Sequence, residues 1–284
     1  MNAAPASDAR RPPGGSTRRF VISLARAFGG ALVFSMPMFM TMELWQLGFA
    51  ADPIRIALLV VLIIPVLVGL SHYCGFEPTF EWQDDVVDAF VGYAVAFAAS
   101  FLVLALFGEM QPGTPWDEVV GKLALQAVGG SIGALLAEGQ FGTRDEHAEE
   151  EKAKTSHAGE LFLMLVGSLF LALSVAPTEE MALIANKMGP IQAIALVGLS
   201  LVVMHAFVYA VGFRGQADVP DGTSRWSLFL RHTVPGYAIA LLASVYLLWT
   251  FGRADGAGLE HIVTTAVVLA FPASIGAAAA RLLI

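Results

Sequence analysis

Long apolar stretches alternate with short polar ones along almost the whole chain. About 20 consecutive apolar residues are needed to cross a hydrocarbon core of about 30 Å, and eight stretches meet this condition. Turn-forming pairs such as Asp52-Pro53 and Gly189-Pro190 separate neighbouring stretches. The pattern predicts an all-α polytopic membrane protein with spans at about 20–49, 52–75, 87–108, 117–138, 158–187, 190–212, 229–251 and 260–283.

Two polar segments lie outside these spans. Residues 1–18 are rich in Ala, Pro, Gly, Ser and Arg and lack an apolar pattern, which is typical of a disordered tail. Residues 141–157 form a run of charged residues between the fourth and fifth spans. We therefore expect a tail (1–18), a first four-helix repeat (19–140), a charged cytoplasmic linker (141–157) and a second four-helix repeat (158–284).

The second half of the chain repeats features of the first half at a nearly constant offset. Gly30 falls on Gly167 at an offset of 137 residues, and Gly92–Ala96 falls on Gly236–Ala240 at an offset of 144. Each repeat holds an even number of spans, so both repeats enter the membrane in the same orientation. The sequence predicts two tandem four-helix repeats related by an axis along the membrane normal. Further matched blocks are Thr41–Glu43 with Thr178–Glu180, Pro53-Ile54 with Pro190-Ile191, and Ser131–Ala134 with Ser274–Ala277.

Composition and charge narrow the class of protein and its partners. The chain is 56% hydrophobic and 14% charged, whereas soluble domains are roughly 45–50% apolar and ~25% charged. The net charge of −8 disfavours nucleic acid as a partner. Of the 16 Lys and Arg residues, 12 fall on the side of the termini and the other 4 on the opposite side. The positive-inside rule then predicts cytoplasmic termini in a cell (inner) membrane. The lipid bilayer is the expected partner, and an oligomer is compatible with the sequence.

Acidic residues that follow prolines mark the main candidate site. Proline tends to break a helix, and broken helices beside acids recur at cation and proton sites of transporters. Glu43 and Glu180 align in the two repeats, and close carboxylates would raise each other's proton affinity. The alternative is that these acids lie in the outer headgroup layer. The candidate cation or proton site comprises Glu43, Glu180, Glu179, Thr41, Thr178, Pro37 and Pro177.

Three further residues are weaker candidates. His205 lies in the middle of the sixth span, and Asp88 and His232 align at the inner ends of the third and seventh spans. These side chains could pass protons, or they could serve packing and solvated helix ends. No phosphate-binding loop, His/Cys metal-ligand spacing, hydrolase motif or potassium-filter motif occurs. We therefore expect no enzyme, cofactor, metal site or catalytic residue. The favoured function is cation or proton movement by a secondary transporter or channel, and the alternative is a non-transporting membrane scaffold or sensor.

One resemblance accompanies these patterns. The segment FGGALVFSMPMFMTMELWQLG at Phe28–Gly48 and the segment APTEEM at Ala176–Met181 resemble a family of uncharacterised bacterial multi-pass membrane proteins of unassigned function. The likeness spans nearly the whole chain. It implies the same multi-span helical fold and supplies no functional residues.

The charge bias generates a test of topology. Reporter fusions placed after Phe141 and at the C-terminus should both report the cytoplasm, because Lys and Arg concentrate on that side. Alkaline phosphatase and fluorescent-protein fusions at each position measure this. A periplasmic signal at either position would show that the number or orientation of the spans is wrong.

Overall fold

The computed structural model describes residues 14–74, 82–141, 156–209 and 225–281, and all regular elements in them are helical. Eight of these helices are long and apolar enough to cross a membrane, which confirms the predicted all-α, eight-span fold. The helices are α1 (Gly14–Phe39), α2 (Met42–Ala50), α3 (Pro53–Cys74), α4 (Trp82–Leu106), α5 (Trp116–Phe141), α7 (His157–Val175), α8 (Glu179–Lys187), α9 (Pro190–Tyr209), α10 (Arg225–Leu228), the π-helix η1 (Phe229–Thr233), α11 (Val234–Thr250) and α12 (Leu259–Arg281).

The two predicted polar segments, 1–18 and 141–157, lie partly within the described residues. Helix α1 begins at Gly14, within the segment predicted as a tail, and helix α5 ends at Phe141. Residues 1–13 and 142–155, which hold the rest of the predicted tail and most of the predicted linker, lie outside the described residues.

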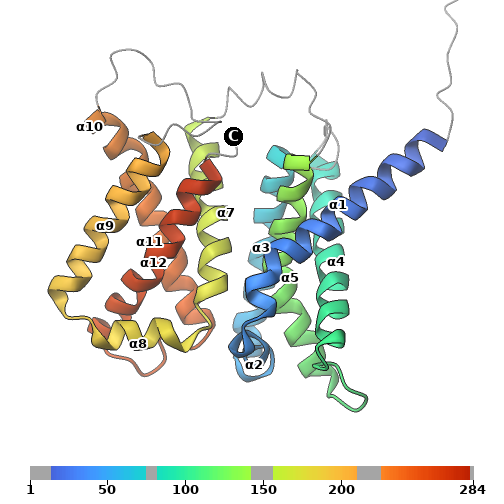
Figure 1. Cartoon of the computed structure of the whole chain (residues 1–284), viewed down its shortest axis with the longest axis horizontal. Helices are drawn as coiled ribbons and strands as arrows, with labels where there is room; N and C mark the ends of the chain where they lie inside the picture. Colours follow the sequence, from blue (N-terminus) through green and yellow to red (C-terminus); the bar gives the residue numbers. More distant parts are fainter. Residues whose placement is uncertain (1–13, 75–81, 142–155, 210–224, 282–284) are drawn as a thin grey trace, which may run out of the picture.

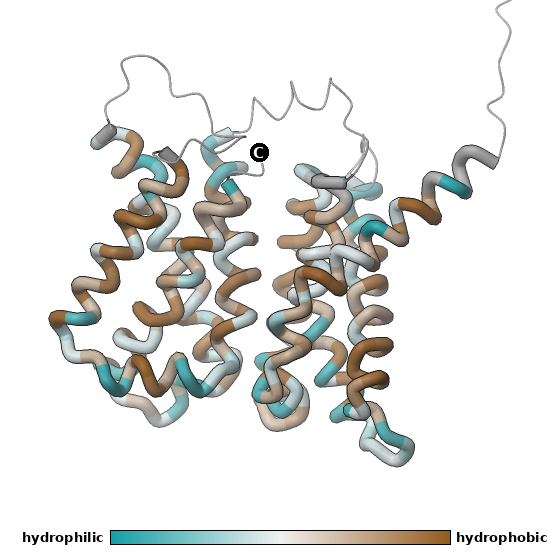
Figure 2. The backbone as a smooth tube through the Cα atoms, viewed as in Figure 1, coloured by the Kyte–Doolittle hydropathy of each residue, from teal (hydrophilic) through white to brown (hydrophobic). Residues whose placement is uncertain are grey.

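The helices form two halves that stand side by side, α1–α5 in one and α7–α12 in the other (Figure 1). The short helices α2 and α8 lie at one end of the molecule, which we call the outer end. Helix α1 begins and helix α12 ends at the opposite end, which we call the inner end (Figure 1). Apolar residues dominate along the spans, whereas hydrophilic residues gather towards the two ends (Figure 2). This distribution suits a bilayer, because charged side chains are expensive in hydrocarbon.

The order of helices is the same in both halves. Helices α2 and α8 are each nine residues long, and each follows a long span. Helices α3 and α9 both begin with a proline, at Pro53 and Pro190. The third span of each half begins with tryptophan, Trp82 and Trp226. This correspondence agrees with the expected tandem repeat, which stays a prediction until the two halves are superposed.

Glycines allow the first and last spans of each half to cross closely. A Cβ atom added to Gly30 of α1 would collide with the backbone of Gly133 in α5. The same relation holds between Gly167 of α7 and Gly276 of α12. Helix association in lipid relies on such close packing, because lipid tails provide no hydrophobic force between helices. These crossings therefore hold each half together.

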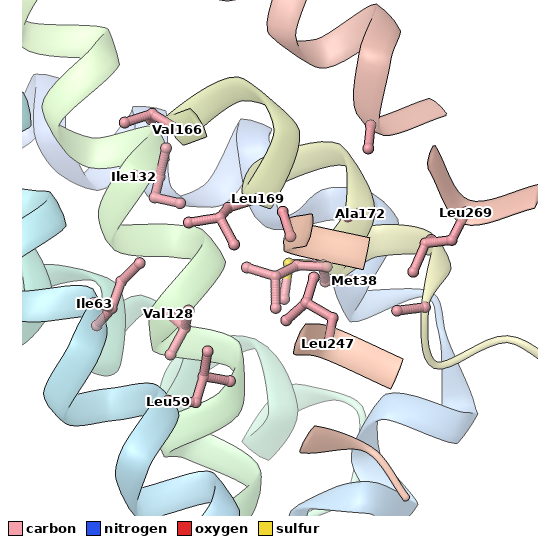
Figure 3. Packing of buried hydrophobic residues seen from close by; sticks show 14 of the residues in the cluster. Met38, Leu59, Ile63, Val128, Ile132, Val166, Leu169, Ala172, Leu247 and Leu269 are labelled. Atoms are coloured by element: carbon pink, nitrogen blue, oxygen red, sulfur yellow. The ribbon is translucent and has the colours of Figure 1, made fainter. Parts of the chain in front are cut away.

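Apolar side chains also join the two halves to each other. One cluster of buried residues continues from α3 and α5 of the first half to α7, α11 and α12 of the second (Figure 3). Two aromatic pairs cross the same interface. The rings of Phe34 and Phe170 lie 5.3 Å apart between centroids, and those of Tyr73 and Phe162 lie 5.9 Å apart.

The glycine crossings generate a matched pair of mutations. Gly30→Ala should lower the free energy of unfolding by ~1–3 kcal/mol, because the added methyl group overpacks the contact with α5. Gly29→Ala should leave stability unchanged or slightly raised, because nothing lies within 4 Å of a Cβ atom at Gly29. Thermal unfolding of both variants in detergent measures the difference. Equal stability of the two variants would contradict the close crossing.

Candidate functional site

The predicted glutamates lie at the outer end, in the first turns of the two short helices. Glu43 is half-buried in α2, whereas Glu179 and Glu180 are exposed at the start of α8. We expected the first span to continue to residue 49 and the fifth to 187. That expectation was wrong, because α1 ends at Phe39 and α7 ends at Val175. The acids therefore follow the spans and are not part of them.

The helix breaks before these acids have a local cause. Pro37 lies in the last turn of α1, and Pro177 lies between α7 and α8. Thr41 and Thr178 then take up extended backbone conformations at the N-caps of α2 and α8. Proline has no N–H group to donate to the preceding turn, which weakens the helix at these points.

Side chains of the protein satisfy carbonyl oxygens at both breaks. The Thr41 hydroxyl donates to the Pro37 carbonyl at 2.7 Å, and the Thr178 hydroxyl donates to the Val175 carbonyl at 2.8 Å. In the first half, the Gln126 amide donates to the Met38 carbonyl at 3.1 Å. In the second half, the Arg253 guanidinium donates to the Pro177 carbonyl. These carbonyl groups thus have protein donors, as backbone groups at membrane depth require.

Several other acids at the outer end are neutralised by bases. Lys122 of α5, only 4% exposed, lies 2.9 Å from a Glu109 carboxylate oxygen and 2.7 Å from one of Glu118. Its ammonium group also lies over the Phe49 ring, 5.6 Å from the centroid. None of these three charged residues is among the site residues predicted from the sequence. The available signal was a lysine within an otherwise apolar span.

A second outer ion pair connects the two halves. Arg55, near the start of α3, lies 2.8 Å from a carboxylate oxygen of Asp255. The same guanidinium donates to the Trp249 carbonyl at 2.8 Å and lies over the Trp249 ring at 4.9 Å. Glu43, Glu179 and Glu180 differ from these acids, because none of them forms an ion pair with a described residue.

The weaker candidate His232 lies in a polar cluster at the inner end of the second half. Its Nδ1 atom lies 2.9 Å from a carboxylate oxygen of Glu160, and that oxygen lies 3.2 Å from the guanidinium of Arg281. The His157 and His232 rings pack edge to face, 4.9 Å apart between centroids. Sequence reasoning missed His157, Glu160 and Arg281. The spacing of His157 and Glu160, three residues apart at the start of one span, was the signal.

The remaining weaker candidates, His205 and Asp88, have other hydrogen-bond partners. His205 of α9 shares a hydrogen bond of 2.9 Å with the Thr233 hydroxyl. Asp88, at the inner end of the first half, accepts a hydrogen bond of 3.2 Å from Ser71. Neighbouring His72 lies 3.4 Å from a carboxylate oxygen of Asp85. Asp88 and His232 align in the repeat but belong to different halves.

The fold and the distribution of polar groups define the class: this is a multi-pass α-helical integral membrane protein. A family model for integral membrane proteins of unknown function, DUF2391, matches residues 23–284, so the chain belongs to that family. No curated protein and no solved structure matches the chain. The resemblance drawn from the sequence is confirmed at the level of the family.

The buried lysine generates a prediction about stability. Lys122→Met should lower the free energy of unfolding by roughly 2–3 kcal/mol, somewhat less than the ~3–5 kcal/mol lost when a fully buried pair is broken. The reason is that Glu109 and Glu118 would face each other without a base, although both are partly exposed. Lys187→Met, which changes an exposed lysine at the same end, is the control. Equal melting temperatures for the two variants would contradict this role.

Proposed function

We propose that this protein moves cations or protons across the cell (inner) membrane, as a secondary transporter or channel, with both termini in the cytoplasm. Glu43 and Glu180 are the candidate acids of its outer entrance. The observation that supports this best is the contrast among the outer acids. Lys122 and Arg55 form ion pairs with Glu109, Glu118 and Asp255, whereas Glu43 and Glu180 have no ion-pair partner among the described residues.

Carboxylates without ion-pair partners on the outer surface raise the local concentration of cations, because a surface of one sign of charge attracts ions of the opposite sign. The position of both acids adds to this effect. Each lies in the first turn of a helix, a position where acidic side chains are favoured by the partial positive charge of the helix N-terminus. We therefore assign the two acids to cation attraction at the entrance.

Polar groups deeper in the molecule also favour transport over a purely structural role. Three buried side-chain oxygen atoms of the first half have no hydrogen-bond partner among the described residues. They are the hydroxyl oxygens of Ser35 and Ser100 and the side-chain amide oxygen of Gln126. In the second half, His205 and Thr233 form a hydrogen bond between two spans. Polar groups within spans are costly, and they recur along ion and proton pathways.

A flux measurement tests the proposal. Purified protein in liposomes should support proton or monovalent-cation flux, and the double variant Glu43→Gln/Glu180→Gln should lower that flux by about tenfold, equivalent to about 1.4 kcal/mol of barrier. A pH-sensitive dye and a potential-sensitive dye report the two kinds of flux. Saturation of flux with cation concentration distinguishes a transporter from a channel.

The matched control is the double variant Asp117→Asn/Glu260→Gln. These acids also lie exposed in first turns at the outer end, at the starts of α5 and α12. This control variant should leave the flux unchanged, because Asp117 and Glu260 do not follow the helix breaks at Pro37 and Pro177. Equal flux in wild type and the Glu43/Glu180 double variant would remove these acids from the mechanism. Absence of flux from well-folded wild-type protein would favour the membrane scaffold or sensor instead.

A further inference from the structure

Two histidines and a glutamate converge at the inner end of the second half. His157 and Glu160 come from the first turn of α7, and His232 comes from η1. Their ligand atoms all lie within 4.8 Å of one another. We propose that His157, Glu160 and His232 form a binding site for a divalent transition-metal ion of the Zn²⁺ class. This inference goes beyond the proposed transport function and holds whether or not the chain moves ions.

The donor set determines the class of ion. Two imidazoles and one carboxylate with an open fourth position are a ligand set that Zn²⁺ takes in proteins. Ca²⁺ and Mg²⁺ prefer oxygen ligands. Among His157, Glu160 and His232, only Glu160 has a side chain with oxygen ligand atoms. These three side chains therefore favour Zn²⁺, a borderline-soft ion, over the hard ions Ca²⁺ and Mg²⁺.

The spacing of the donors agrees with one ion between them. His157 and Glu160 are three residues apart on one helix, so their side chains share a face. Ligand atoms at about 2.0 Å from a tetrahedral Zn²⁺ lie about 3.3 Å from one another. His232 Nδ1 and the Glu160 carboxylate oxygen already lie 2.9 Å apart, and the two imidazole rings are neighbours. Small side-chain rotations would bring the three donors around one ion.

An irregularity of the backbone lies at this site and supports it independently. Residues Phe229–Thr233 form a π-helical turn, and His232 is part of it. At the repeat offset of 144 residues, the corresponding positions 85–89 of α4 are regular α-helix. A π-helical turn inserts one residue into a helix and is frequently found at functional sites. The second half therefore departs from the regular pattern at the turn that supplies His232.

Arg281 has a defined place in this arrangement. Its side chain is 6% exposed and lies 3.2 Å from the carboxylate oxygen of Glu160. Carboxylates that bind metals are commonly held by outer hydrogen-bond donors of this kind. The positive charge of Arg281 also repels a bound cation, as does the charge of Arg231, which lies next to His232 in η1. We therefore expect Arg281→Gln to tighten metal binding if the carboxylate keeps its position.

Binding can be measured without any assay of transport. Tag-free protein in detergent, stripped with a chelator, is titrated with Co²⁺, whose visible absorption reports tetrahedral nitrogen and oxygen ligands, and then with Zn²⁺ in competition. Wild type should bind one ion per chain. His157→Ala, His232→Ala and Glu160→Gln should each weaken binding by at least about tenfold, which is the smallest loss typical of even an outer-shell change.

His72→Ala is the matched control. His72 and Asp85 form a histidine–carboxylate pair at the inner end of the first half, but they are not part of the one trio found among the described residues. This variant should bind the metal as wild type does. Elution as a single species and a cooperative thermal transition establish that each variant is folded.

Two results would overturn the site. One is metal binding that survives His232→Ala and Glu160→Gln unchanged. The other is no metal binding by folded wild-type protein. In that case a lower melting temperature for Glu160→Gln would assign the cluster to ion pairing between α7, η1 and α12. Absence of ion flux in liposomes would contradict the proposed transport function. It would not contradict the metal site if the titration shows binding.

Discussion

Hydrogen bonding of the backbone inside hydrocarbon is the constraint on which the rest of the structure depends. A backbone group without a partner costs several kcal/mol in lipid, so the spans must be helical and any break must be satisfied by protein. The outer breaks meet this demand with side chains. Thr41 and Gln126 serve the first half, and Thr178 and Arg253 serve the second. Because these donors are in place, α2 and α8 can leave the direction of the spans.

Close helix crossings follow from the same environment. Without a hydrophobic force between helices in lipid, packing is strongest where backbones approach each other, and only small residues permit this. Gly30 and Gly133 provide such a crossing in the first half, as Gly167 and Gly276 do in the second. Each half is thereby built as a tightly packed unit, and larger apolar and aromatic side chains fill the interface between the halves.

The two ends of the bundle differ in how they handle charge. At the outer end, Lys122 and Arg55 neutralise part of an acidic surface and leave Glu43 and Glu180 without such partners. At the inner end of the second half, charge is gathered into one cluster around Glu160. An acidic outer surface attracts cations, and an inner cluster of imidazole and carboxylate provides ligands for one. The proposed entrance and the proposed metal site thus occupy opposite ends of the molecule.

Hydropathy along the chain was enough to predict eight helical spans, because about 20 apolar residues in a row are a local property. Glu43 and Glu180 were singled out by the prolines that precede them and by the repeat alignment, and His232 by its alignment with Asp88. Hydropathy did not predict that α2 and α8 are separate helices, since a proline can either kink or end a helix and the donors that satisfy the break come from other spans. Likewise, Glu160, His232 and Arg281 meet only after α7, η1 and α12 have packed. Such contacts depend on helix rotation and side-chain direction, which only the tertiary structure decides.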